Sequence, residues 1–291
     1  MLSDIVDVLA DPVDGTRLAG ADDFTRLVSE SGHSYDVAKQ GYVTLSAGAG
    51  LNHEGDSLEM VMAREVFLSQ GHFAPFVEAV TDRVSRALEA TSAAEPVVVE
   101  VGAGTGYYLA HTLDSIAGVR GVGLDISVPA AKRLAKAHPR VGAVVADVWE
   151  GLPLLDASIN VITVVFAPRN PAEFARVLAP QGEVVVMIPG HGHLDELRAP
   201  LGILGVEEGK LERLVEQAAG HLELIGEPEV LEFPMRLDRE SIAAQVGMSP
   251  SARHIEPATL DERLRALPDH LAVTARGIIV RMRKASEPLE G

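Results

Sequence analysis

The amino-acid sequence predicts an α/β fold built on a mostly parallel β-sheet, with a small module at the N-terminal end. From residue 97 onward, short runs that are apolar throughout alternate with segments in which apolar residues recur every three or four positions. Such alternation is typical of a parallel sheet that has helices on both faces. Glycines at positions 102, 104 and 106 directly follow the first apolar run, as in ligand-binding turns at the end of such strands.

Five apolar runs predict the strands of the parallel sheet. They cover residues 97–101, 121–125, 143–147, 161–166 and 183–189. Helical periodicity predicts connecting helices at residues 107–116, 128–137 and 171–178, and a further helix at residues 211–219. Two longer runs, residues 222–236 and 272–283, predict the last pair of strands.

The residues ahead of the sheet predict two smaller units. Residues 1–50 contain short apolar pieces broken by Asp-Pro, Asp-Gly and Ser-Gly, which is typical of a loop-rich module. Residues 57–71 and 73–90 show helical periodicity, so we expect a helical linker region over residues 51–95. The main domain is then expected to cover residues 96–285.

Composition excludes several kinds of protein. The chain has 291 residues, a net charge of −17 and no cysteine, so disulfides and thiolate metal sites are excluded. No apolar stretch reaches the 18 or so residues of a membrane span, and the acidic start (Asp4, Asp7) is unlike a signal peptide. We therefore expect a cytoplasmic protein without membrane contact. The negative charge disfavours non-specific binding to nucleic acid.

The residues around the glycines favour one kind of nucleotide-like ligand. They read Glu100-x-Gly-x-Gly-x-Gly106, without the Gly-x-Gly-x-x-Gly spacing of a dinucleotide site. Glycines let the backbone approach a ligand closely, and the following helix offers free N–H groups. Asp125 ends the next predicted strand, where an acid accepts hydrogen bonds from ribose hydroxyls. An ordinary glycine turn and a nicotinamide site remain as alternatives.

This pattern resembles motif I of the class I S-adenosylmethionine-dependent methyltransferases, whose Rossmann-like sheet ends in an antiparallel strand. The resemblance implies that S-adenosylmethionine binds with its amino-acid part against the turn and its ribose at Asp125. Asp147 resembles the acid that contacts adenine in these enzymes. The implied contacts to the amino-acid part come from Glu100, Gly102, Ala103, Gly104, Thr105, Gly106 and Tyr107.

Three further stretches, residues 32–45, 55–73 and 166–178, resemble the RlmA family of 23S ribosomal RNA guanine-N1 methyltransferases, which includes tylosin-resistance members. They contain Gly-Tyr-Val-Thr-Leu at 41–45, Ser-Gln-Gly-His-Phe at 69–73 and Phe-Ala-Pro-Arg-Asn at 166–170. The resemblance implies methylation of guanine N1 in a 23S ribosomal RNA hairpin loop, by a protein that forms a homodimer. It also implies that Phe73 and His193 line the cofactor pocket.

One family feature is missing from this sequence. RlmA-type proteins carry an N-terminal zinc site of three cysteines and one histidine, and the matching positions here hold Asp11, Asp14, Ser29 and His33. Structural zinc sites favour sulfur and nitrogen ligands, so we expect no metal at these positions. We expect a metal-free module packed by Leu9, Leu18, Phe24, Leu27 and Tyr35.

The sequence does not identify the catalytic base. Guanine N1 carries a proton of low acidity, so a base, or a group that stabilises negative charge on O6, has to assist its loss. Candidates are Asp56 and Asp147 as bases and Arg169 as a cation that holds O6 or a phosphate. Two other readings stay open: a small-molecule methyltransferase, which the charge and the missing cysteines favour, and a non-catalytic S-adenosylmethionine-binding protein.

Overall fold

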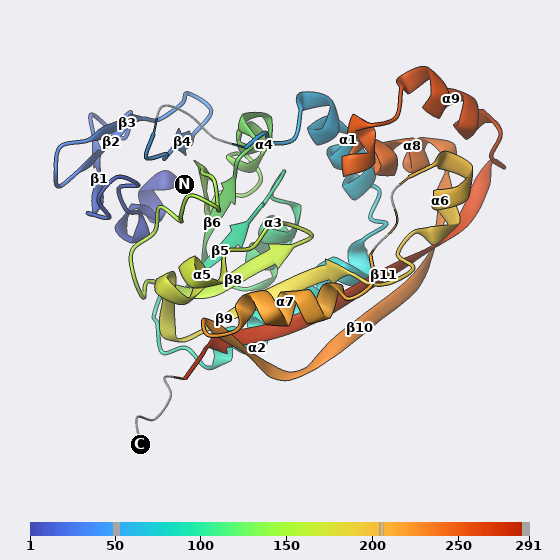
Figure 1. Ribbon diagram of the computed structural model, residues 1–291. Coiled ribbons are helices and arrows are strands. Elements are labelled where there is room, and N and C mark those ends of the chain that lie inside the picture. Colours follow the sequence, from blue (N-terminus) through green and yellow to red (C-terminus); the bar gives the residue numbers. More distant parts are fainter. Residues whose placement is uncertain (49–52, 204, 206, 287–291) are drawn as a thin grey trace.

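A computed structural model describes residues 1–48, 53–203, 205 and 207–286 of the chain (Figure 1). Its centre is one sheet of eight strands. Their spatial order is β10 (Leu222–Asp238), β11 (His270–Lys284), β9 (Leu178–Pro189), β8 (Ile159–Val165), β5 (Val97–Val101), β6 (Arg120–Asp125), β7 (Val141–Val145) and β4 (Tyr42–Thr44).

The pairing confirms the predicted fold class. The six strands from β4 to β9 run parallel to one another, whereas β11 is antiparallel to both β9 and β10. β5 lies between β6 and β8, so the chain reverses its direction of travel across the sheet beside β5. Ligands of open α/β sheets bind at the carboxyl ends of the strands at this switch point, and the glycine turn follows β5 at that place.

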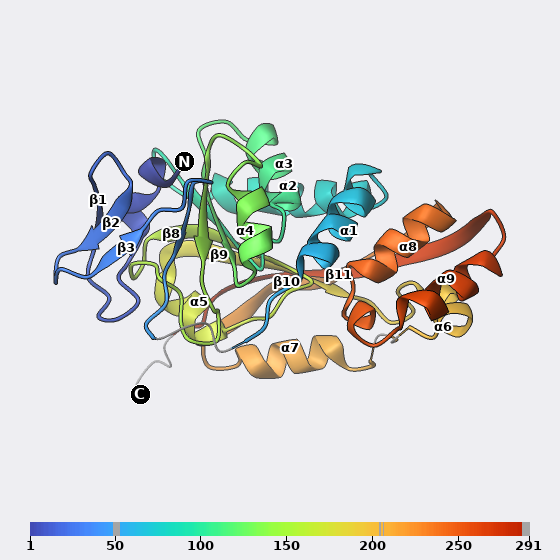
Figure 2. The ribbon, with the colours of Figure 1, turned by 90° about the horizontal axis from the view of Figure 1, so that it is seen from above.

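Helices cover both faces of the sheet because its side chains alternate between two cores (Figure 2). Val98 packs on the side of α2 (Ala74–Glu89) and α3 (Tyr107–Ser115), whereas Val97 and Val99 pack on the side of α5 (Pro171–Val177) and α7 (Lys210–Ala218). Each strand of the inner sheet is buried on both faces, which explains the continuous apolar runs in the sequence.

Predicted elements differ from the observed ones mainly in length. β9 begins at Leu178 instead of residue 183, and α4 (Val128–Leu134) ends three residues before the predicted end. Three helices near the C-terminal end were missed: α6 (Asp195–Leu201), α8 (Arg239–Gly247) and α9 (Pro257–Arg265). These helices are short, and α6 contains Pro200, so the sequence shows little helical periodicity there.

α1 (Leu58–Ser69) joins the missed helices to the sheet. It packs against both α8 and α4, so it lies beside the ends of the central strands. Figure 1 shows α6, α8 and α9 together at one end of the molecule, opposite the N-terminal residues. Within the described residues, no helix has the length and apolar character needed to cross a bilayer.

The N-terminal residues form a small antiparallel sheet of β1 (Leu18–Ala21), β2 (Arg26–Ser29) and β3 (Ser34–Asp36), preceded by the 3-10 turns η1 (Leu2–Asp4) and η2 (Val6–Val8). Leu9, Leu18 and Leu27 are buried and share a core with the large sheet, whereas Phe24 is partly exposed, contrary to expectation. The expected boundary at residues 50 and 51 lies outside the described residues, and the division into module, linker region and main domain remains a proposal.

Candidate active site

The glycine turn connects β5 to α3 at the switch point of the sheet. Gly102, Gly104 and Gly106 have φ angles of 68°, 55° and 81°, a left-handed region that residues with a side chain rarely adopt. A Cβ atom at Gly102 would lie 2.4 Å from the Cβ atom of Ala167, in the loop after β8. Backbone conformation and the close approach of a second loop therefore both require glycine.

Asp125, the last residue of β6, holds this turn by hydrogen bonds. Its Oδ2 accepts a hydrogen bond from Gly104 N–H at 2.7 Å, and its Oδ1 accepts one from Ser127 N–H at 2.8 Å. Burial is the largest influence on the Asp125 carboxyl and raises its pKa, while the two N–H donors act against that shift. Each carboxylate oxygen has a second lone pair, so Asp125 can hold the turn and still accept ribose hydroxyls.

A cavity of about 250 Å³, here called the Asp125 cavity, opens beside these residues and is lined by Gly102, Gly104, Asp125, Asp147 and Trp149 among others. Asp147 is buried, and its Oδ2 lies 2.6 Å from Nδ1 of His53, while its Oδ1 accepts a bond from Trp149 N–H at 2.9 Å. His53 could not be selected from the sequence, because a histidine in a loop has no diagnostic neighbours.

The Glu100 cavity is a smaller hollow on the other side of the turn. Its wall includes Gly102, Ala103, Thr105 and Tyr107, all expected at the amino-acid part of the cofactor. Glu100 itself is buried and accepts a hydrogen bond from Leu109 N–H at 2.9 Å; burial raises its pKa to about 8. Its carboxyl is therefore mostly protonated at neutral pH until a cation, such as an ammonium group, lies beside it.

Two side chains of the Glu100 cavity, Arg64 and Tyr108, were missed by the sequence analysis. Arg64 comes from α1, and its Nη2 donates to Asp56 Oδ2 at 2.5 Å and to the Met248 carbonyl at 3.3 Å. Its Nε and the hydroxyl of Tyr108 are buried with no partner among the described residues. Buried donors without partners are costly, so both groups indicate a bound ligand with acceptor atoms at this place.

Aromatic rings line a third and larger space, the His193 cavity, with a volume of about 780 Å³. The rings of Phe73 and His193 lie 6.0 Å apart, as do those of Phe166 and His193. Phe166 has a φ angle of 54°, unusual for a residue with a side chain and typical of positions under functional constraint. The predicted pocket residues Phe73 and His193 thus lie together on the wall of this cavity.

His193 is electrically neutral and has a defined hydrogen-bonding state. Burial is the main cause that lowers its pKa to about 4. Its Nδ1 accepts a hydrogen bond from Arg276 N–H at 3.0 Å, so the proton of the neutral ring is on Nε2. His193 can therefore donate a hydrogen bond from Nε2, but it is a poor base near pH 7.

The three candidate catalytic residues separate between these cavities. Asp56 lines both the Asp125 cavity and the His193 cavity, Arg169 lines the His193 cavity, and Asp147 lines the Asp125 cavity alone. Arg64 and Phe166 line all three cavities, so the spaces adjoin one another around these two side chains. A ligand that extends through the first two cavities would reach the third, where a second molecule can approach it.

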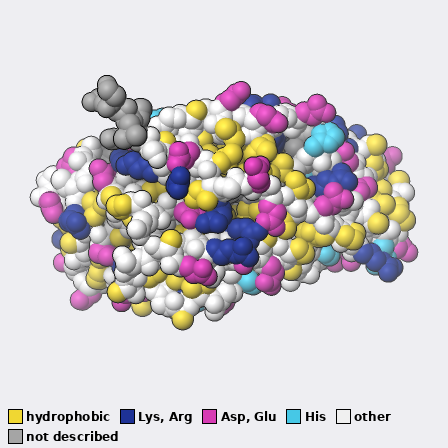
Figure 3. All heavy atoms as spheres, turned by 90° about the horizontal axis from the view of Figure 1, so that it is seen from below, with side chains coloured by type: hydrophobic (Ala, Val, Ile, Leu, Met, Phe, Trp, Pro, Cys, Tyr) yellow, Lys and Arg dark blue, Asp and Glu magenta, His cyan; other side chains and the backbone are white. Residues whose placement is uncertain are grey.

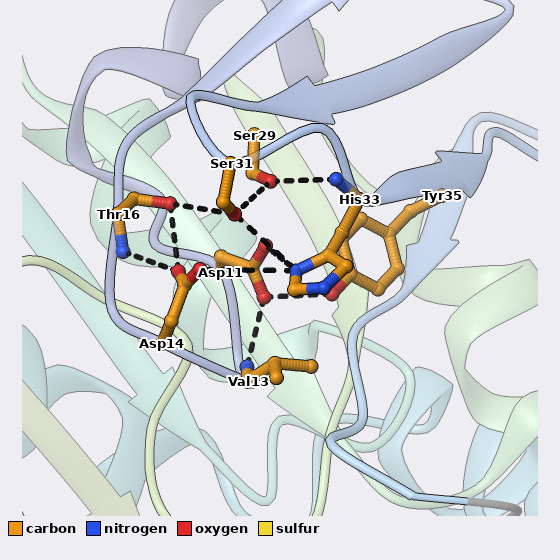
Figure 4. A network of polar contacts seen from close by, with 8 residues as sticks. All are labelled: Asp11, Val13, Asp14, Thr16, Ser29, Ser31, His33 and Tyr35. Carbon is orange, nitrogen blue, oxygen red and sulfur yellow. Dashed lines mark hydrogen bonds and ion pairs between the residues drawn. The ribbon is translucent and has the colours of Figure 1, made fainter.

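A separate polar cluster lies in the N-terminal module, at the positions that match the zinc ligands of RlmA-type proteins (Figure 4). The buried carboxylate of Asp11 accepts hydrogen bonds from Val13 N–H and Tyr35 O–H, each at 2.8 Å, and lies 2.7 Å from Nδ1 of His33. Ser29 Oγ accepts a bond from His33 N–H at 2.9 Å. Burial alone would raise the pKa of Asp11, but these donors lower it to about 2.

The same cluster has the geometry of a weak cation site. Ligand atoms of Asp11, Asp14 and His33 all lie within 4.8 Å of one another, and Asp14 and His33 are exposed. Every one of these groups also has a hydrogen-bond partner within the chain. The expectation that no metal binds here remains a prediction.

The cavities fit S-adenosylmethionine part by part. Asp125 and Asp147 offer acceptors for the ribose and adenine, and the buried donors of Arg64 and Tyr108 match a carboxylate. Residues 98–182 match the protein family described as a methyltransferase domain. The chain is therefore a class I S-adenosylmethionine-dependent methyltransferase, as its sheet order and glycine turn indicate.

Comparison with known proteins narrows this class. The chain is 42% identical over 97% of its length to a protein of Micromonospora griseorubida named putative 23S rRNA (guanine-N(1)-)-methyltransferase, and it covers 99% of that protein. It is also 42% identical over 84% of its length to the 23S rRNA (guanine(748)-N(1))-methyltransferase of Streptomyces fradiae, of which it covers 86%. The chain belongs to the RlmA family of 23S rRNA guanine-N1 methyltransferases.

Solved structures are more distant from this chain. The YcgJ protein of Bacillus subtilis is 16% identical, with a TM-score of 0.47, and the match covers 72% of this chain and all of that one.

Replacing Asp125 by alanine is expected to weaken binding of S-adenosylhomocysteine at least tenfold, because the ribose loses its acceptor and the glycine turn loses its tie to β6. Isothermal titration calorimetry measures the affinity. Asp114→Ala, an exposed residue on α3, is the matched control and should bind normally. Unchanged affinity of the Asp125 variant would refute the assignment.

Replacing Arg64 by methionine should weaken S-adenosylhomocysteine binding about tenfold, since a buried charged hydrogen bond contributes about 1.5–3 kcal/mol. The affinity for 5′-methylthioadenosine, which lacks the amino-acid part, should change by less than threefold. Arg133→Met, on α4, removes an exposed ion pair with Glu65 and is the control. Equal losses for both ligands would place Arg64 away from the carboxylate.

Replacing Asp11 by asparagine should lower the free energy of unfolding by about 2 kcal/mol at pH 7. The stabilisation by a carboxyl with a depressed pKa is complete above the unfolded pKa, near 3.8, and is lost as the pH falls toward about 2. Urea unfolding at pH 7 and pH 3 should therefore give a smaller difference between the wild type and the variant at pH 3. The same difference at both pH values would contradict this role of Asp11.

Proposed function

We propose that this protein methylates N1 of a guanine in a hairpin loop of 23S ribosomal RNA. The observation that carries the proposal is the His193 cavity, which adjoins the cofactor cavities and presents aromatic rings beside polar groups. Enzymes that modify a base take it out of the stack and hold it against aromatic side chains. The named relatives, which match nearly the whole length of the chain, support the same acceptor.

In this proposal S-adenosylmethionine supplies a methyl group from its sulfonium sulfur. Residues at the border of the His193 cavity would hold that group next to the guanine N1, which would accept the methyl carbon as sulfur leaves it. The N1 proton passes to Asp56, the one of the two candidate bases that lines this cavity. Asp147 is proposed as the adenine contact, because it lines the Asp125 cavity and is already bonded to His53.

Stabilisation of the negative charge that develops on guanine O6 is the second requirement of the reaction. The neutral ring of His193 presents Nε2–H, because its Nδ1 is occupied by Arg276 N–H. A donor that is buried and held in place stabilises a developing negative charge better than water does. We assign His193 to O6 and the remaining aromatic contacts of the base to Phe166.

The overall charge of −17 still has to be reconciled with RNA binding. On the face seen in Figure 3, Lys and Arg side chains occur in small groups with Asp and Glu beside them, and no broad basic area appears. The proposal therefore places RNA recognition at the cavity and not on this surface. In this proposal the protein acts in the cytoplasm, and its methylation would produce tylosin-type resistance.

The homodimer implied by family resemblance is a further proposal. Leu58, Met62 and Val66 form an exposed apolar stripe along α1, at the spacing of successive helical turns. Such a stripe is compatible with a contact between two copies.

Methylation of unmodified 23S ribosomal RNA with labelled S-adenosylmethionine tests the function. N1-methylguanine blocks base pairing, so reverse transcription should stop at a single guanine in a hairpin loop. No label in the RNA, from protein whose cofactor binding has been measured, would contradict the proposal. Transfer to a small molecule instead would support the alternative acceptor.

A further inference from the structure

One wall of the His193 cavity carries positive charge from two neighbouring segments. Arg169 lies between β8 and α5, Lys210 is the first residue of α7, and Arg213 follows one turn later. Since α5 and α7 are in contact, the fold brings these segments side by side. Figure 1 shows the two helices at the same side of the sheet.

Among the described residues, two of these three cations form no ion pair with an acidic side chain, although Glu207 lies close enough to attract Lys210. Arg213 pairs with Glu207 at 3.0 Å. Arg169 donates from Nη1 to the Ala167 carbonyl at 3.3 Å, while its Nε is buried with no partner among the described residues. Lys210 forms no ion pair with any of the described residues.

The charges of the described residues that line the cavity do not balance. The acids on its wall are Asp56 and Glu207, and both already hold an arginine. The cations are Arg64, Arg169, Lys210 and Arg213. The chain as a whole has a net charge of −17, so its average surface is negative. Uncompensated positive charge on the wall of this cavity differs from that surface and indicates an anionic ligand.

The cost of this arrangement supports the same conclusion. Burial lowers the pKa of Arg169. Burial is also the largest influence on Lys210 and lowers its pKa; the nearby Glu207 acts against that shift, whereas repulsion from Arg169 and Arg213 adds to it. Lys210 and Arg213 also lie in the first turn of α7, where the helix dipole favours negative charge. A bound anion would remove both penalties and would accept hydrogen bonds from the free N–H groups of that turn.

We propose that Arg169 and Lys210, together with the first turn of α7, bind a phosphate group of the acceptor nucleotide. This inference rests on the proposed function and adds the part of the acceptor that the cavity recognises. With the base against Phe166 and its O6 at His193, a phosphate at Arg169 fixes the nucleotide at both ends. It also explains how an acidic protein binds RNA: affinity comes from a few phosphate contacts within one cavity.

The first experiment measures how binding of a fluorescent 23S hairpin oligonucleotide depends on salt. Each phosphate contact contributes about 0.7–0.9 to the slope of log affinity against log salt concentration. The double variant Arg169→Met/Lys210→Met should lower that slope by about 1.5 and weaken binding at least tenfold in 0.1 M salt. Arg283→Met, which removes an exposed pair with Glu223 on the far part of the sheet, is the control and should leave the slope unchanged.

The second experiment compares guanosine monophosphate with guanosine as ligands of the protein loaded with S-adenosylhomocysteine. The wild type should prefer the monophosphate at least tenfold, and the double variant less than threefold. Circular dichroism and S-adenosylhomocysteine affinity verify that the double variant is folded.

The outcomes separate the two proposals. Hairpin binding with an unchanged slope in the double variant would overturn the phosphate site while the proposed function stands. Preference for the monophosphate without hairpin binding would support the site and count against the RNA acceptor. If the protein neither bound the hairpin nor preferred the monophosphate, the RNA acceptor and the phosphate site would both be refuted.

Discussion

The hydrogen bond from Gly104 N–H to Asp125 determines the geometry of the whole site. It joins the turn after β5 to the end of β6, and a second bond, from Ser127 N–H, fixes the start of α4 to the same carboxylate. A side chain at Gly102 would collide with Ala167, so the position of the turn also sets the position of the loop after β8. That loop carries Phe166 and Arg169 into the His193 cavity. One carboxylate thus links the glycine turn to the shape of the His193 cavity.

Arg64 provides the second link, between parts of the chain that are far apart in sequence. From α1 it reaches Asp56 and the Met248 carbonyl, which follows α8. It also lines all three cavities. A ligand carboxylate at Arg64 would therefore contact the same residue that positions Asp56 and α8. α8, which lies outside the matched methyltransferase domain, belongs to the site for this reason.

The sequence allowed prediction of the features that depend on local patterns. The apolar runs predicted the inner strands within a few residues because those strands are buried on both faces, and the glycine spacing identified the turn. Arg64 could not be found in this way, since an arginine on an amphipathic helix usually faces solvent. Its role depends on the packing of α1 against α8, a contact between residues 64 and 248 that no local pattern records. The pairing of His53 with Asp147 was missed for the same reason.

A crystal structure of the protein with S-adenosylhomocysteine is the most direct test of this account. Ribose hydroxyls are expected within hydrogen-bonding distance of Asp125, and the cofactor carboxylate within that distance of Arg64 Nε. The sulfur atom should face the His193 cavity, where the acceptor base is expected. A cofactor whose carboxylate lies away from Arg64, or whose sulfur faces away from Phe166 and His193, would contradict the account.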